Sequence, residues 1–179
     1  MFGEANINIQ ERVSYMEKYV LSIMADNRAN VLARIAALFA RRRFNIDAIT
    51  ASETSNPAIT RITIVTHGDE DVLNQVIGQT EKLQDVREVF VLERDNSVMR
   101  ELLLIKIIAP ANYRSELKDI ADIYKAKIVD LSVDSMILEL TGKSEKIDGF
   151  LKVMEPYEIV EMCRTGITGM ERGMGKMRS

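Results

Sequence analysis

Residues 19–40 read YVLSIMADNRANVLARIAALFA, and this stretch decides the fold. Residues 19–25 form a short apolar run, which is typical of a β-strand. Residues 26–30 are polar and indicate a loop. Beyond the loop, apolar residues recur at the spacing of one face of an amphipathic helix, namely Val31, Leu32, Ile35, Leu38 and Phe39. The stretch therefore predicts a strand, a loop and a helix, in that order.

The rest of the first half continues this alternation. Residues 45–53 are rich in Ile and Thr and predict a second strand, and residues 59–67 alternate apolar and polar side chains, as a third strand does. Residues 72–83 carry apolar side chains at helical spacing, and residues 86–92 form another apolar run. Turn residues at 54–57 and 68–69 separate these elements. The predicted order is βαββαβ.

The second half repeats the same order. Strands are expected at 99–109, 127–133, 136–140 and 159–164, with helices marked by Leu117 to Tyr124 and by Ile147 to Met154 at i, i+3, i+4, i+7 spacing. Two βαββαβ units predict an α+β chain with two ferredoxin-like domains. We place an N-terminal extension at 1–18, the first domain at 19–94 and the C-terminal domain at 98–166. The tail at 167–179, rich in glycine and methionine, is expected to be mobile.

Composition argues against several classes of function. The chain has 24 basic and 27 acidic residues, a net charge of −3, which does not favour a nucleic-acid partner. No apolar run approaches the ~18 residues of a membrane span, so we expect no membrane association. Cys163 is the single cysteine, which suits a cytoplasmic location, and its apolar strand predicts that it is buried. Because His67 is the single histidine, we expect neither a histidine-based catalytic site nor a His/Cys metal site in this chain.

Several stretches in a fixed order resemble one family. They are LSIMADN (21–27), LARIAALFARRRFNIDAIT (32–50), RITIVTHGDE (61–70), EKLQDV (81–86), KIVDLS (127–132), ELTG (139–142) and RTGITGMERG (164–173). The first domain, 19–94, resembles an ACT domain, the amino-acid-binding module of many biosynthetic regulators. Over about 150 residues the chain is similar to the small subunit of acetolactate synthase, also called acetohydroxyacid synthase.

The candidate effector site combines the first loop with the start of the second strand. Unpaired N–H groups at a helix N-terminus suit the carboxylate of an amino acid, and side-chain amides both donate and accept hydrogen bonds. The resemblance implies that ACT domains pair so that the first loop of one chain faces the second strand of its partner, which makes a homodimer. The effector-binding candidates are Asp26, Asn27, Asn30, Val31, Leu32, Asn45 and Ile46.

Simpler roles for these residues stay open, and two positions depart from the family. Asn30 also suits the N-cap of the first helix, and Asn45 also suits a turn after that helix. Asn30 stands where the family usually has glycine, which lets the backbone approach the effector closely. Its side chain adds bulk, which bears on the strength of inhibition. Arg43 likewise replaces a usual glycine after the helix.

The resemblance also implies a function and a partner. The chain is expected to be a regulatory subunit without a catalytic site or cofactor of its own. Its partner is the large catalytic subunit, which carries thiamine diphosphate, magnesium and FAD and works in valine, leucine and isoleucine synthesis. The small subunit raises that activity and makes it sensitive to a branched-chain amino acid, typically valine. The alternatives are a free-standing ACT-type sensor that acts on another enzyme or a transcription regulator, and an enzyme built on this fold, which the lack of a nucleophile–base pair disfavours.

Overall fold

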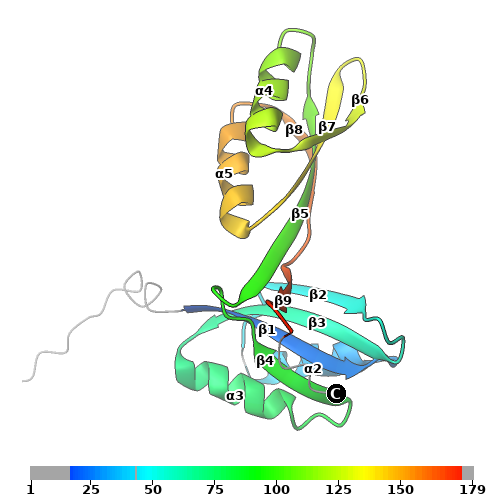
Figure 1. Cartoon of the computed structure of the whole chain (residues 1–179), viewed down its shortest axis with the longest axis vertical. Coiled ribbons are helices and arrows are strands. Elements are labelled where there is room, and N and C mark those ends of the chain that lie inside the picture. Colours follow the sequence, from blue (N-terminus) through cyan, green and yellow to red (C-terminus); the bar gives the residue numbers. More distant parts are fainter. Residues whose placement is uncertain (1–16, 43, 175–179) are drawn as a thin grey trace, which may run out of the picture. The chain divides into compact units, whose positions relative to one another are not determined.

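A computed structural model describes residues 17–42 and 44–174 of the chain. The internal contacts divide it into two compact units, with the boundary between Asn96 and Ser97. Each unit consists of a sheet and two helices. Figure 1 shows the helices of each unit on one face of its sheet. The predicted α+β class with two ferredoxin-like domains is confirmed.

The first unit is a four-stranded antiparallel sheet with two helices. Its elements are β1 (Glu17–Asp26), α2 (Val31–Arg41), β2 (Ala48–Glu53), β3 (Ile59–Gly68), α3 (Glu70–Thr80) and β4 (Val86–Val91). The strand order is β2-β3-β1-β4, so β2 and β4 are the two edge strands. This order places the end of β1, and the loop that follows it, beside the turn between β2 and β3, where Asp26 pairs with Ile59.

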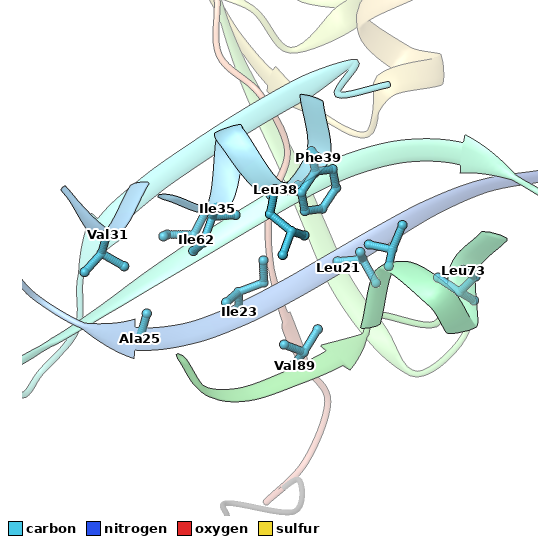
Figure 2. Packing of buried hydrophobic residues seen from close by; sticks show 12 residues of the cluster. Leu21, Ile23, Ala25, Val31, Ile35, Leu38, Phe39, Ile62, Leu73 and Val89 are labelled. Atoms are coloured by element: carbon cyan, nitrogen blue, oxygen red, sulfur yellow. The ribbon is translucent and has the colours of Figure 1, made fainter. Parts of the chain in front are cut away.

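The core of this unit lies between the sheet and its helices. Leu21 pairs with Ile64 and Ile23 with Ile62 across β1 and β3, so these four side chains share one face. The helices cover this face with apolar residues, as Figure 2 shows for Val31, Ile35, Leu38, Phe39 and Leu73. Helix α3 begins at a true cap, because the carboxylate of Asp69 accepts from the N–H of Val72 at 2.8 Å.

The second unit repeats the architecture. Its elements are β5 (Ser97–Ile108), α4 (Arg114–Tyr124), β6 (Lys127–Leu131), β7 (Ser135–Gly142), α5 (Ser144–Met154), β8 (Ile159–Arg164) and β9 (Thr168–Glu171). The strand order is β6-β7-β5-β8, and β9 pairs with the beginning of β5. Glu101 is buried on β5 and is neutralised by Arg164 on β8, with 2.5 Å between Oε2 and Nε. Such a pair is tolerated at low exposure because each charge keeps a hydrogen-bonded partner.

Three sequence-based expectations are wrong. Residues 168–171 are not a mobile tail, because they form β9 and pair with Ser97 to Arg100 of β5. Residues 17–18 belong to β1 instead of an extension, since they pair with the end of β3. Cys163 is exposed, because β8 lies at the edge of the second sheet, where no further strand of the described residues pairs with it. Among the residues that the structure describes, no helix is both long and apolar enough to cross a membrane.

Candidate functional site

The loop between β1 and α2 is held by main-chain hydrogen bonds. The N–H of Asp26 donates to the carbonyl of Asp85, and that of Asn27 to the carbonyl of Ala58, both at 2.8 Å. The N–H of Val31 donates to the carbonyl of Arg28 at 3.4 Å. Within the described residues, the N–H groups of Ala29 and Asn30 have no partner. These two groups, at the N-terminus of α2, are what the loop can offer to an anion.

Asn30 occupies the helix N-cap position, but its side chain makes no capping hydrogen bond. Its backbone is left-handed, with φ 69° and ψ 0°. In this conformation the side chain does not reach back to the N–H groups of the first turn. A residue with a β-carbon costs on the order of 1 kcal/mol in this region, although asparagine tolerates it better than most. Asn30 therefore stands at the predicted N-cap position but does not cap the helix through its side chain, and its conformation is one that glycine adopts freely.

The carboxylate of Asp26 is already occupied. Its Oδ1 accepts from Nε of Arg87 on β4 at 2.7 Å, and its Oδ2 lies 3.7 Å from Nε of Arg28. The hydrogen bond from Arg87 holds the pKa of Asp26 below its ordinary value, more strongly than partial desolvation raises it. Asp26 therefore ties the loop to β4, and the ion pair limits its use as a partner for a ligand cation.

Three other candidates lie in this loop or directly after it. Nδ2 of Asn27 donates to the carbonyl of Pro57 at 2.9 Å and approaches Glu53 at 3.4 Å, which fixes the loop against the turn between β2 and β3. The Val31 side chain is 3% exposed and packs in the core, so it can only support the loop from beneath. Leu32, by contrast, is 44% exposed and offers an apolar surface beside the loop.

Asn45 and Ile46 lie before β2, which begins at Ala48 instead of residue 45. Thr66 on β3 explains this, because its hydroxyl donates to the carbonyl of Asn45 at 2.7 Å and replaces a ladder bond. Ile46 packs against the core of the first unit. The Asn45 side chain is exposed, and its Nδ2 donates to Oδ1 of Asp47 at 2.5 Å. Oδ2 of Asp47 in turn contacts Nδ1 of His67.

Sequence patterns did not single out Asp47 or Arg87, and they gave His67 no role at the site. Asp47 stands two residues from Asn45 in the quoted motif, but nothing in the sequence shows that β3 brings His67 to it. His67 lies 20 residues further along the chain. Arg43 lies outside the described residues. No group of three or more His, Cys, Asp or Glu in the described ranges could hold a metal ion.

The candidates fall into two groups at opposite ends of β3. The loop group lies beside Ile59, the first residue of β3, whereas Asn45 is bonded to Thr66 near its last residue. Seven residues of antiparallel strand separate these positions by roughly 24 Å. Within one chain, the two groups therefore cannot contact the same small ligand.

Comparisons with known proteins decide the family. Residues 21–88 match the description "AHAS small subunit-like ACT domain", and residues 100–173 match "Small subunit of acetolactate synthase". The chain is 43% identical over 162 residues to the probable acetolactate synthase small subunit of Methanothermobacter thermautotrophicus, which covers 90% of this chain and 96% of that protein. It belongs to the acetolactate synthase small-subunit family.

Other members of the family agree in sequence and in structure. The acetolactate synthase small subunit of Bacillus subtilis is 38% identical over 158 residues, covering 87% of this chain and 91% of that one. The crystal structure of the acetolactate synthase small subunit from Thermotoga maritima superposes with a TM-score of 0.83 at 33% identity, covering 88% and 98% of the two chains. Membership of this small-subunit family confirms the predicted resemblance and the expectation of a non-catalytic subunit.

Proposed function

We propose that this small subunit binds a branched-chain amino acid, valine first among the candidates, between two copies of its ACT domain. Through this binding it regulates a large catalytic subunit of acetolactate synthase. The large subunit is the partner that carries thiamine diphosphate, magnesium and FAD. This chain contributes the effector site and no part of the catalytic chemistry.

The separation of the two candidate groups carries the proposal. The loop at 26–30 offers N–H groups that suit a carboxylate, and Asn45 offers an amide that suits an ammonium group. An amino acid presents both groups a few ångströms apart, whereas one chain holds its two candidate partners roughly 24 Å apart. A second copy of the chain supplies the missing half at each end.

Strand β2 gives a way for the two copies to meet. It is an edge strand, and most of its side chains are exposed. If two β2 strands pair antiparallel about a two-fold axis, the Asn45 end of one chain lies beside the Glu53 end of the other. Asn27 approaches Glu53 in the same chain, so the loop at 26–30 lies at that end. This isologous arrangement creates two equivalent effector sites and also covers an exposed edge.

Regulation then follows from linkage. The effector must bind one arrangement of the paired ACT domains more tightly than another, and the large subunit must respond to that difference. An effector that bridges two chains satisfies the first requirement, because any change in the pairing moves the two halves of its site relative to one another. The match over both halves of the chain favours this role over that of a free-standing sensor.

The test is inhibition of the reconstituted complex. L-Valine, L-leucine and L-isoleucine are titrated into the large subunit with and without this chain while acetolactate formation is measured. We expect the chain to raise the activity and to make it sensitive to at least one of the three amino acids. Asn45→Ala is expected to keep the activation and to weaken the inhibition about tenfold or more, through the loss of one hydrogen bond to a charged group. Equal inhibition of complexes with the natural chain and with Asn45→Ala would contradict the proposed site.

A further inference from the structure

We propose that Asp47 is a specificity-determining residue of the effector site. It holds the side-chain amide of Asn45 with its oxygen available, so that the site selects ligands with an ammonium group. This inference rests on the proposed function, because it takes Asn45 as a contact of the effector. It adds a residue that does not itself need to touch the ligand.

The orientation of the Asn45 amide follows from the chemistry of its partner. An ionised carboxylate only accepts hydrogen bonds, so the amide group that faces Oδ1 of Asp47 must be the NH₂ group. The carbonyl oxygen of the amide then points elsewhere, and within the described residues no donor reaches it. Asn45 therefore presents an acceptor to a ligand, and an acceptor suits the ammonium group of an amino acid.

His67 holds the carboxylate of Asp47, which in turn holds the side-chain amide of Asn45. Its Nδ1 contacts Oδ2 of Asp47, the oxygen that Asn45 does not use. Both oxygens of Asp47 are thus engaged by side chains from two segments, the one before β2 and the end of β3. The same carboxylate adds negative charge next to the Asn45 amide, which further favours a cationic group over a neutral or anionic one.

A purely structural role does not account for Asp47. The main chain of this segment is already held without the carboxylate. The N–H of Asp47 donates to the carbonyl of Val65 at 2.9 Å, and that of Phe44 to the carbonyl of Phe39 at 3.0 Å. Thr66 also holds the carbonyl of Asn45. The carboxylate is therefore not needed to set the path of the segment, and its contacts are with the side chains of Asn45 and His67.

The experiment measures discrimination by titration calorimetry with the full-length chain. The probes are L-valine, L-leucine and L-isoleucine, each beside the carboxylic acid that lacks its ammonium group, such as 3-methylbutanoate for valine. The natural chain is expected to prefer the amino acid. Asp47→Ala is expected to lower the ratio of the two affinities about tenfold, because the amide of Asn45 becomes free to rotate. Asp47→Asn keeps one acceptor oxygen and is expected to retain most of the ratio.

A control and a folding check make the outcomes separable. Asp148→Ala removes an aspartate that pairs with Arg164 in the second unit, and it is expected to leave the ratio unchanged. Thermal denaturation identifies any variant that fails to fold. If Asp47→Ala does not fold, the affinity ratio of Asp47→Asn is used to test the inference. If a folded Asp47 variant without the acceptor keeps the ratio of the natural chain, this inference is overturned alone. If the natural chain binds none of the three amino acids, the proposed function is overturned and this inference with it.

Discussion

At Asn30, a single substitution by glycine is expected to relieve backbone strain and to make room for the proposed effector. The left-handed backbone strains any residue with a β-carbon, and the side chain gains nothing from capping. The same side chain is exposed at the loop whose N–H groups suit a carboxylate. Glycine therefore removes strain and bulk together, whereas most substitutions at a binding site exchange one advantage for another.

We predict that Asn30→Gly raises the free energy of unfolding by up to roughly 1 kcal/mol and tightens effector binding. Asn30→Ala is the matched control, because it removes the same side chain but keeps the β-carbon. It is expected to lower stability by roughly 0.5–1 kcal/mol, since alanine tolerates left-handed angles less well than asparagine. Urea denaturation measures stability, and calorimetry measures affinity. An Asn30→Ala chain as stable as Asn30→Gly would show that the strain argument is wrong.

At the scale of elements, periodicity predicted the long strands and helices but not their ends. Strand β9 has only four residues with a central Gly169, so no alternation marks it, and it exists because the start of β5 offers a pairing partner. The Ile- and Thr-rich run after Asn45 and Ile46 predicts a start of β2 at residue 45, three residues before the observed start at Ala48. A contact from Thr66 ends the ladder there, and local sequence carries no sign of it.

In the candidate site, too, the sequence predicts some residues and gives no sign of others. The two asparagines at 27 and 45 were found from residue chemistry and the family resemblance. Asp47 and His67 were not assigned a role, because their contact depends on how β3 aligns with the segment before β2. Distances between the two groups of candidates likewise depend on strand register, which a sequence pattern specifies only once the pairing is known.

Strand β2 is the element whose exposed edge we assign to pairing of two chains. Ile49 on β2 is 38% exposed. We predict that Ile49→Lys leaves the chain folded but shifts it toward monomers at micromolar concentration, because a charged side chain disfavours a strand pairing at an edge. Ile159→Lys is the matched control, since Ile159 is 41% exposed on the edge strand β8 of the second sheet. Light scattering measures the mass of both variants, and dissociation by Ile159→Lys instead of Ile49→Lys would move the interface to the other sheet.

At the scale of the whole molecule, the proposed effector site belongs to the dimer and not to the chain. In this proposal, each site takes the loop at 26–30 from one copy and Asn45 from the other. Such a site exists only in the dimer, because separating the two chains removes it completely. This property links effector binding to association, so an effector is expected to stabilise the paired state by a free energy that rises with the logarithm of its concentration above its dissociation constant.

Mixing two damaged chains tests this arrangement. Ala29 is exposed, so Ala29→Asp keeps the fold and places a negative charge where the effector carboxylate is expected. Asn45→Ala damages the other half of the site. A dimer of either variant alone has two damaged sites, but a mixed dimer has one site with both defects and one site with none. We predict that mixed dimers, co-expressed with two affinity tags and purified through both, bind effector at about one half of the natural stoichiometry with natural affinity. Calorimetry reports stoichiometry and affinity together, and each homodimer serves as the control. If the loop and Asn45 acted within one chain, the mixed dimer would bind no better than the two homodimers.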